Sequence, residues 1–201
     1  TECTIGEDRI AHLAWTNVSA SYTGITLLID CTAAPGSPLP GTATSYVSAA
    51  LSPGLHAFTL QPYIGAYSAS ESACSATAPL PPPTAFTCTA AAGSLTITLA
   101  WTNGWTYDSV VIRRNGTVIR TVTGTTTSVT DTPAAPGTYL YELQGVLADQ
   151  TSALAPCTVE QTYVAPVTIT TCAIDASRAA HLAWTNCAAD YDGITLLVDG
   201  A

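Results

Sequence analysis

The sequence contains neither methionine nor lysine, and only 9% of its residues are charged. All five basic residues are arginines, and the formal net charge is −9. Binding to nucleic acid needs clustered basic side chains that neutralise phosphates, so this balance argues against a nucleic-acid partner. The acidity needs no role beyond solubility to explain it.

Long apolar runs are also missing. No stretch approaches the roughly 18 apolar residues that cross a bilayer as a helix, and no segment has the pattern of a signal peptide. The sequence therefore predicts no membrane span. Because it does not start with methionine, we expect it to be a mature piece of a longer protein.

Patterns typical of enzymes and metal sites are absent too. There is no serine, histidine and acid set on a nucleophile elbow, no paired carboxylates in one predicted cleft, and no closely spaced pair of cysteines. Four aspartates fall near turns, where backbone conformation explains them, and no EF-hand spacing supports calcium. These are Asp30, Asp190, Asp192 and Asp199. We predict that the chain is not an enzyme and binds no metal or cofactor.

What the sequence does contain is a repeat. Residues 12–17, His-Leu-Ala-Trp-Thr-Asn, return unchanged as residues 181–186, and a looser copy occupies residues 99–103. The cysteines follow the same spacing, because each copy of the tryptophan comes about a dozen residues after a cysteine: Cys3, Cys88 and Cys172. A period of about 85 residues is too long for a solenoid repeat and fits one small all-β domain. We therefore predict a tandem array of similar modules.

Composition and alternation favour β structure within each module. Apolar residues make up 47% of the chain, and threonine dominates the polar residues. In the middle repeat, residues 94–101 alternate between apolar and polar, which is typical of a strand with one buried face. Asn115-Gly116 is a strong hairpin signal, because both central positions of a type I′ turn need positive φ. The other expected strands are residues 107–114, 117–122, 125–130, 139–144 and one leading to Cys157. Seven short strands in about 75 residues indicate a β-sandwich.

The module boundaries follow from the repeat and from proline-rich stretches. We expect module 1 at residues 1–77, module 2 at residues 86–160 and the first strands of an incomplete module 3 at residues 169–201. Residues 78–85 form a proline-rich linker and residues 161–168 a second linker. Module 3 ends after its second core strand. Either the chain was cut there, or a neighbouring chain supplies the missing strands.

Several residues resemble fibronectin type III and related immunoglobulin-like modules. They are Trp101 in the second strand, Tyr107 opening the third, Asp131 before a Pro-Gly turn, and residues 137–141. The resemblance implies tandem seven-stranded sandwiches joined by short proline-containing linkers. It implies a core position for Trp15, Trp101, Trp184 and Tyr139, with the Tyr139 hydroxyl tying a corner between strands. Module 1 departs from the pattern, since His56 stands at the position of Tyr139 and Ser48 at that of Asp131.

The cysteine spacing predicts one covalent staple per complete module. Cys3 with Cys74 and Cys88 with Cys157 lie 71 and 69 residues apart, and each pair would join the first strand of a module to its last. Cys172 would pair with a residue beyond the fragment. Cys31 and Cys187 remain, at expected module tips. Either they cross-link modules or subunits, or one is a buried free thiol and the other forms a local bridge.

Candidate modification sites lie on the exposed faces. Asn17 and Asn115 each begin an N-glycosylation sequon at an expected loop or turn. Threonines that face away from the expected core are candidates for O-linked sugar, although threonine is also simply a good strand residue. These are Thr96, Thr98, Thr121 and Thr123.

Taken together, these features predict a structural repeat of a secreted protein, located outside the cell or at its surface. Such a segment would assemble with copies of itself into a filament, hair or sheath, would carry covalent glycans, and would be stapled by disulfides. Two alternatives stay open. An adhesin or carbohydrate-binding array would need exposed aromatics, for which Trp105, Tyr63 and Tyr163 are the candidates. A spacer beside a secreted enzyme would need no site of its own.

Overall fold

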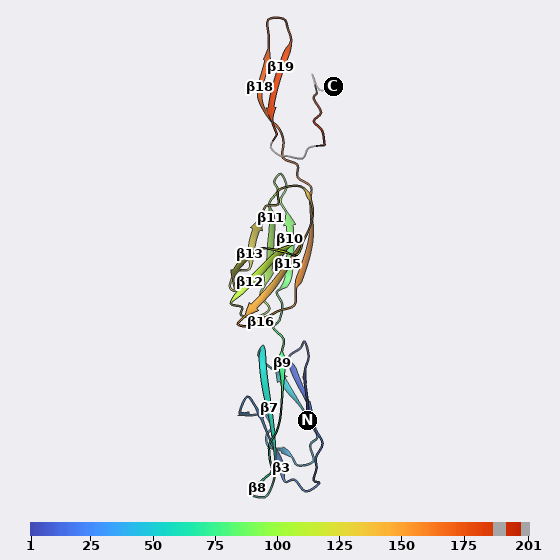
Figure 1. Cartoon of the computed structure of the whole chain (residues 1–201), viewed down its shortest axis with the longest axis vertical. Coiled ribbons are helices and arrows are strands. Elements are labelled where there is room, and N and C mark those ends of the chain that lie inside the picture. The colour runs from blue at the N-terminus through green and yellow to red at the C-terminus, as the bar shows by residue number, and fades with distance from the viewer. Residues whose placement is uncertain (187–191, 198–201) are drawn as a thin grey trace.

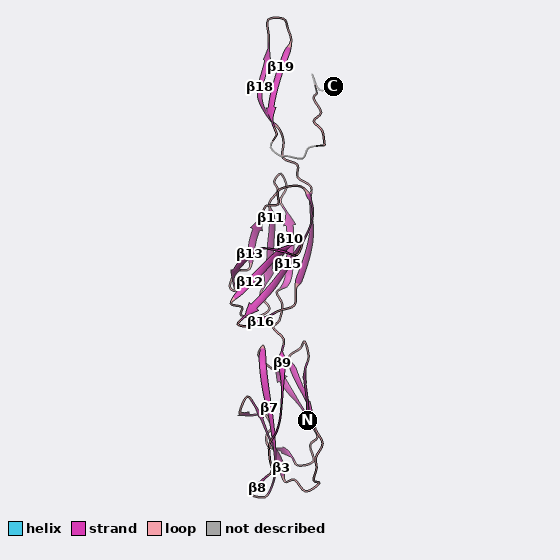
Figure 2. Ribbon diagram, viewed as in Figure 1, coloured by secondary structure: helices cyan, strands magenta, loops and turns pink. Residues whose placement is uncertain are grey.

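The structure, a computed structural model, is built from β-strands joined by turns and loops (Figure 2). It describes residues 1–186 and 192–197. The described residues form no helix, and therefore none with the length and apolar character that a membrane crossing requires. The predicted all-β fold class is confirmed. Figure 1 shows three units that follow one another along the long axis of the molecule.

The first unit is a sandwich of two antiparallel sheets. One sheet has the order β1 (Glu2–Ile5), β2 (Ile10–Ala14) and β6 (Ser45–Ala50). The other is centred on β3 (Gly24–Ile29), β7 (Gly54–Ile64) and β9 (Ser72–Ala78). Three short strands extend this second sheet: β4 (Thr32–Ala33), β5 (Leu39–Pro40) and β8 (Tyr67–Ser68).

The second unit repeats this topology with fuller strands. Its first sheet has the order β10 (Thr84–Ala90), β11 (Ile97–Thr102) and β14 (Ser128–Asp131). Its second sheet contains β13 (Thr117–Thr123), β12 (Ser109–Arg114), β15 (Gly137–Leu147), β16 (Gln150–Thr151) and β17 (Ala155–Gln161). The expected Asn-Gly turn joins β12 to β13, and both of its central residues have positive φ, 50° at Asn115 and 79° at Gly116.

The two sandwiches differ most in the strand after that hairpin. The second unit has a strand of seven residues there, β13, whereas the first has only two short pieces, β4 and β5. The sequence of the first unit explains the difference, because Pro35, Pro38 and Pro40 fall in this segment and proline cannot donate to a ladder. The first module therefore has only these two short pieces where the second has a regular strand.

Each sandwich has its own apolar core between the sheets. The core of the first unit is built on Leu13, Ile25, Leu27, Phe58 and Leu60, all at most 3% exposed. In the second unit Trp101 is buried as expected, at 5% exposed, beside Ile97, Leu99, Ile112, Tyr141 and Leu143. Trp15 and Tyr139 are partly buried and pack against the edges of these cores.

The third unit is a two-stranded sheet of β18 (Thr168–Ile174) and β19 (Ala180–Thr185). The expected core residue Trp184 lies on β19 and is 43% exposed, so the core assignment does not hold for it. The physical reason is that no second sheet covers this pair of strands among the described residues. A shallow apolar hollow remains, formed by Trp184 with Val167, Ile169, Leu182, Ile194 and Leu196.

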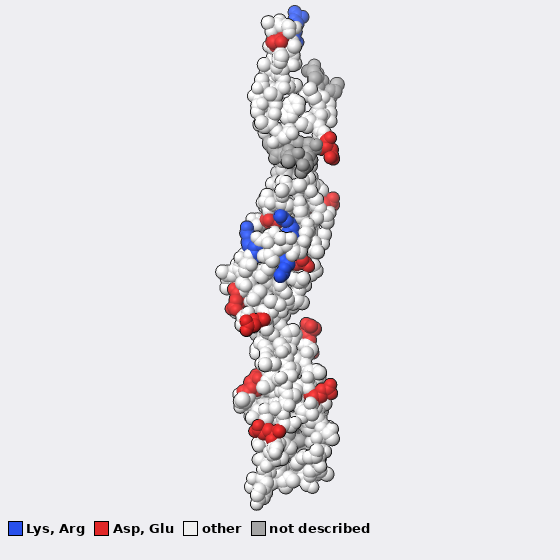
Figure 3. Space-filling view, viewed as in Figure 1, with Lys and Arg blue, Asp and Glu red and all other residues white. Residues whose placement is uncertain are grey.

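Charged side chains are sparse and unevenly distributed. Acidic residues occur on all three units in Figure 3. Three of the five arginines, Arg113, Arg114 and Arg120, sit on the β12–β13 hairpin of the second unit. The remaining two, Arg9 and Arg178, occupy equivalent turns of the first and third units, both with positive φ.

Candidate functional site

Each complete sandwich is closed by a disulfide between its first and its last strand. Cys3 in β1 pairs with Cys74 in β9, and Cys88 in β10 pairs with Cys157 in β17. The two bonds join equivalent strands in both modules, with Cα–Cα distances of 6.2 and 6.1 Å. In each module the bonded strands belong to different sheets and are neighbours only through packing. The disulfide therefore joins the two sheets covalently at one edge.

This placement also determines the path of a load along the chain. Force enters a module through its first strand and leaves through its last, so it passes from one cysteine to the other across the disulfide. The chain between the two cysteines of each module therefore carries no load. The cysteines are 71 positions apart in the first module and 69 in the second. A pulled module can therefore lengthen only by the few residues outside its staple while the bond is intact.

The corner before β15 contains the hydrogen bond that the fibronectin resemblance implies. The Tyr139 hydroxyl donates to the carbonyl oxygen of Ala135, four residues earlier, at 2.7 Å. The guanidinium of Arg114 lies over the Tyr139 ring, 5.6 Å from its centroid. The bond fixes the Pro-Gly turn against the start of β15.

In the first module His56 takes the place of that tyrosine. Its Nε2 lies 2.8 Å from the carbonyl oxygen of Ser52, again four residues earlier, and its Nδ1 lies 2.6 Å from Asp30 Oδ2. The other Asp30 oxygen accepts the Ala57 backbone N–H at 2.9 Å. Sequence reasoning treated His56 as a weakening of the corner. The structure shows an intact corner, with an added ion pair to the neighbouring hairpin turn.

The environment shifts the pKa of both members of this pair toward their charged forms. Burial opposes the charge on His56, yet the Ser52 carbonyl and the Asp30 carboxylate raise its pKa above the ordinary value. The backbone N–H of Ala57, with His56 beside it, lowers the pKa of Asp30. Both shifts mean that folding favours the charged pair.

We expect the stability of the first module to depend on pH. Because the pKa of His56 is raised, its charged form adds to the free energy of unfolding of the first module. This stabilisation is complete below about pH 6.5 and is lost as the pH rises through the folded-state pKa. Because the pKa of Asp30 is lowered, its ionised form also stabilises the first module. This stabilisation is complete above about pH 3.9 and is lost as the pH falls through the folded-state pKa of Asp30. The module should be most stable between these limits.

Denaturant unfolding at about pH 5.5 and about pH 8 measures this effect. Because Asp30 is half exposed, water screens the pair, and a loss of about 1 kcal/mol is expected at the higher pH. Asp30→Asn should flatten the dependence, and the second module, with Tyr139 at the corner, is the internal control. Equal pH dependence in both modules would contradict the assignment.

A second polar cluster joins the two sheets of the second module. Asp131 at the end of β14 accepts from Arg114 at 2.6 Å and from the Tyr141 hydroxyl at 2.8 Å. Arg114 and Tyr141 belong to the opposite sheet. Burial opposes the charge on Arg114, but the Asp131 carboxylate raises its pKa, and burial likewise raises the pKa of Tyr141. At the equivalent place in the first module, Ser48 accepts the Ala11 backbone N–H instead.

The linker between the first two modules is packed into the second one. Leu80 is 3% exposed and belongs to the second core, together with Trp101, Tyr107 and Leu143. The Tyr107 hydroxyl donates to the Pro81 carbonyl oxygen at 2.7 Å. The proline-rich stretch is therefore part of the second module rather than a free spacer.

Two further contacts bridge the modules themselves. The Arg9 guanidinium lies 5.0 Å from the centroid of the Trp105 ring, and Arg9 Nε also donates to the carbonyl oxygen of Leu51. Gln150 Nε2 donates to the carbonyl oxygen of Ala78 at 3.1 Å. Trp105, one of the three candidate aromatics for the carbohydrate-binding alternative, contacts Arg9 at this joint.

The other two candidate aromatics do not form a platform either. Tyr63 lies across Gly24, where an added Cβ would sit within 3 Å of its ring. Tyr163 follows the second module, and its backbone N–H donates to Gln161 Oε1 at 2.9 Å. Gln161, at the end of β17, is buried and donates to the carbonyl oxygen of Ser94 within the second module.

The two sequons have different environments. Asn17 Nδ2 donates to the carbonyl oxygens of Gly41 and Ala43, at 3.1 and 3.0 Å. A glycan replaces one hydrogen of this nitrogen, so it would break one of the two bonds. Asn115 is exposed, and its Oδ1, not its Nδ2, holds the neighbouring strand through the Leu140 N–H. Of the candidate threonines, Thr98, Thr121 and Thr123 are exposed, whereas Thr96 is half-buried.

The cysteines outside the two staples lie on the surface or outside the described residues. Cys31 and Cys172 are exposed and carry free thiols. Cys31 is at the tip of a hairpin with φ 64°, in the position that Gly116 fills with φ 79°. Cys187 lies outside the described residues. No group of three or more histidine, cysteine or acidic side chains is placed for metal binding in the part of the chain that the structure describes.

Sequence reasoning missed the roles of three residues that carry this architecture: Leu80, Arg9 and His56. For His56 a signal was present, because Ser52-Pro-Gly-Leu-His56 aligns with Ala135-Pro-Gly-Thr-Tyr139. For Leu80 the only signal was one apolar residue inside a proline run. Nothing local links Arg9 to Trp105.

Comparison with known proteins supports the fold. No family model matches the chain, and no curated protein matches it by sequence. A two-domain fibronectin type III segment of chicken tenascin is similar in structure, with a TM-score of 0.67, 17% sequence identity, and coverage of 80% of this chain and 97% of that one. The chicken interferon gamma receptor alpha chain has a TM-score of 0.49 and 12% identity, covering 81% of this chain and 96% of that one. The chain has the fold of tandem fibronectin type III modules.

Proposed function

We propose that this tandem of fibronectin type III-like sandwiches is an inextensible structural segment of an extracellular protein. The observation that carries the proposal is the pair of disulfides that connect the first and last strands of both complete modules. A staple at that place shields almost the whole module from load. The buried linker adds a fixed joint, because Leu80 and Pro81 are held by the second module.

An extracellular location is supported by the same bonds. Disulfides persist in oxidising compartments and are rare where glutathione keeps thiols reduced. Two exposed free thiols, at Cys31 and Cys172, would there be open to pairing between chains. Cys31 is the better candidate for a cross-link, because it occupies a backbone conformation that glycine fills in the second module.

The finer part of the proposal is assembly with copies of the same chain into a filament, hair or sheath. Negative-stain electron microscopy of the unreduced native material tests it. Filaments with an axial repeat of one or two module lengths, in which peptide mapping finds Cys31 disulfide-bonded, are expected. Dispersed short rods with Cys31 recovered as a free thiol would overturn the assembly and leave a spacer segment.

We expect Trp105→Ala to loosen the joint between the first two modules. The substitution removes the cation–π contact with Arg9, which is worth about 0.5–2 kcal/mol for this half-buried pair. Residual dipolar couplings report the relative orientation of the modules, and a single alignment tensor should split into two. Trp184→Ala, in the third unit, is the matched control. If Trp105→Ala leaves one common tensor, the contact does not orient the modules.

Glycosylation, where the host supplies it, is expected at Asn115 and not at Asn17. The Asn17 amide nitrogen is used twice in bracing a loop, whereas that of Asn115 is not used in holding its hairpin. Expression of the chain through a glycosylating secretory pathway, followed by intact-mass measurement of Asn115→Gln and Asn17→Gln, separates the two sites. Only Asn115→Gln should remove glycan mass. Loss of mass in Asn17→Gln would contradict the assignment.

A further inference from the structure

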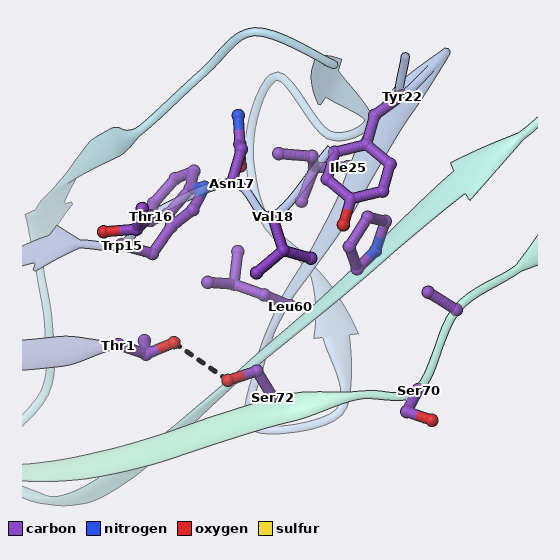
Figure 4. A pocket seen from close by; sticks show the side chains of 12 residues that line it. Thr1, Trp15, Thr16, Asn17, Val18, Tyr22, Ile25, Leu60, Ser70 and Ser72 are labelled. Carbon is purple, nitrogen blue, oxygen red and sulfur yellow. Dashed lines mark hydrogen bonds between the residues drawn. The ribbon is translucent and has the colours of Figure 1, made fainter. Parts of the chain in front are cut away.

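The end of the first module that points away from the second carries an open pocket of about 400 Å³. Figure 4 shows its lining, with Trp15 on one side, Leu60 below and Ile25 beside Tyr22. Tyr22 and Val18 stand at its mouth. The lining is apolar and aromatic with a polar rim, where Thr1 Oγ1 and Ser72 Oγ are 2.9 Å apart. This hollow is the uncovered end of the sandwich core, and it is called the end socket below.

The second module has the same socket, and there it is filled. The repeated Trp-Thr-Asn aligns Trp15 with Trp101 and Val18 with Gly104. Tyr22 takes the place of Tyr107 after one extra residue, because the Thr23 N–H bonds the Tyr63 carbonyl as the Asp108 N–H bonds that of Val146. The linker covers these positions: Tyr107 bonds Pro81, and a Cβ on Gly104 would be only 2.1 Å from the Pro82 carbonyl oxygen. Leu80 is buried in the core beneath.

One substitution between the modules explains why the first socket stays open. In the second module the Tyr107 ring lies on Gly145, where an added Cβ would be 2.4 Å from the ring. Pro62 takes the place of Gly145, since Ile25 pairs with Pro62 as Val110 pairs with Gly145. The Pro62 ring occupies the space that the tyrosine ring would need. Tyr22 is therefore displaced to the rim, and the pocket is left for an outside group.

A buried donor in the socket also lacks an acceptor. Trp15 Nε1 is buried and has no hydrogen-bond partner among the described residues. Its counterpart in the second module, Trp101 Nε1, donates to Asn103 Oδ1 at 2.9 Å. The matching Asn17 holds loop carbonyls through its Nδ2, as Asn103 holds that of Gly124, but its Oδ1 accepts no hydrogen bond from Trp15 Nε1. A ligand carbonyl oxygen that reached Trp15 Nε1 would remove the cost of an unsatisfied buried donor.

We propose that the end socket binds an extended leucine-and-proline peptide segment of the Ala78–Pro83 type, supplied from outside the first module. Such a segment suits the socket because proline has no N–H to satisfy, its polyproline II backbone exposes carbonyl oxygens, and its rings pack on aromatic side chains. The absence of charged side chains from the lining fits an uncharged occupant. The leucine would fill the pocket as Leu80 fills the second core.

The occupant is a segment that is not already part of a joint. Leu80 of the chain's own linker is buried, and the carbonyl oxygen of Ala78 is bonded to Gln150. A second copy could offer its linker only by opening its own joint. The end socket thus binds a further segment of the kind that joins modules. This proposal does not depend on whether the chain forms filaments.

Binding of a synthetic peptide to the full, oxidised chain tests the proposal. The probe is the capped peptide Ala-Thr-Ala-Pro-Leu-Pro-Pro-Pro-Thr, which copies residues 76–84. The readout is the indole N–H resonance of each tryptophan, because the four indoles report on different places: Trp15 the socket, Trp101 and Trp105 the second module, and Trp184 the third unit. We expect a saturable shift of Trp15 alone. A peptide with aspartate in place of leucine should bind at least about tenfold more weakly, because a charge would be buried unpaired.

A socket variant makes the outcome decisive. Val18 is 92% exposed at the mouth, so Val18→Arg should leave the fold intact while it places a charge in the path of the leucine. Weakening of peptide binding by about tenfold or more is expected. Val118→Arg, at a 52% exposed valine of β13, is the matched control and should bind normally. No shift of Trp15 at millimolar peptide, equal binding by Val18→Arg, or a shift centred on Trp184 would overturn the proposal.

Discussion

Replacing Cys88 and Cys157 by alanine lowers the free energy of unfolding of the second module by about 4 kcal/mol. The bond closes a loop of 69 residues, and opening it restores conformational freedom mainly to the unfolded chain. Such a loss is a large part of the 5–15 kcal/mol that typically separates folded from unfolded states. Loss of this disulfide should lower the denaturant midpoint of the second module and leave that of the first unchanged.

Module-resolved unfolding, by hydrogen exchange of β11 and β15 under increasing denaturant, measures this loss. The double variant Cys31→Ala with Cys172→Ala is the matched control, because both thiols are free and exposed. It should change the stability of either complete module by less than about 0.5 kcal/mol. A loss of under about 1 kcal/mol for the staple variant would mean that the disulfide does not constrain the unfolded chain as described.

Leu80→Ala destabilises the second module by about 3 kcal/mol, even though the residue lies in a linker between two modules. The side chain is 3% exposed and fills the end of the second core beside Trp101 and Tyr107. Removing it loses the transfer free energy of the buried atoms and leaves a cavity that the staple and the surrounding strands prevent from collapsing. The first module should keep its stability, since its core does not contain Leu80.

The same hydrogen-exchange experiment separates the loss of the buried Leu80 side chain from the effect of any leucine-to-alanine substitution at the surface. Leu154→Ala is the control, because Leu154 is 45% exposed on the surface of the second module. Its effect should stay within about 0.5 kcal/mol. Equal effects for the two substitutions would show that the linker packs on the second module only loosely, and the account of a fixed joint would fail.

The modules could be predicted from the sequence because their signals are periodic. The alternation over residues 94–101, the Asn115-Gly116 turn and the repeated tryptophan indicate strands, a hairpin and a core without any long-range information. The cysteine spacing likewise indicated the two disulfides. The core position of Trp184 was predicted by analogy with Trp101 and is wrong, because no second sheet covers that residue in the described part of the chain.

The joint could not be predicted in the same way, because it depends on which surfaces meet. Arg9 and Trp105 are 96 positions apart in the sequence, and neither stands in a motif. Proline-rich linkers usually act as spacers, so a buried leucine within one gives no periodic signal. His56 was recognisable as a departure from tyrosine, but its ion pair with Asp30 becomes evident only when the hairpin and the corner are folded together.

The turn that carries Arg9 at the first joint has a counterpart in the third unit. At the first joint the Arg9 guanidinium lies over the Trp105 ring. Arg178 of the third unit occupies the same turn position as Arg9, with the same positive φ. Modules one and three thus resemble each other at this end, as their shared residues 12–17 and 181–186 already indicated.

Single-molecule stretching of the native, unreduced chain tests the central claim of inextensibility most directly. With force applied through handles before residue 3 and after residue 157, the oxidised chain should show no lengthening step of module size. After reduction, each complete module should add about 240 Å when it unfolds, because separations of 71 and 69 residues are released. Module-sized steps in the unreduced chain would contradict the account, since they would show that load does not pass through the disulfides.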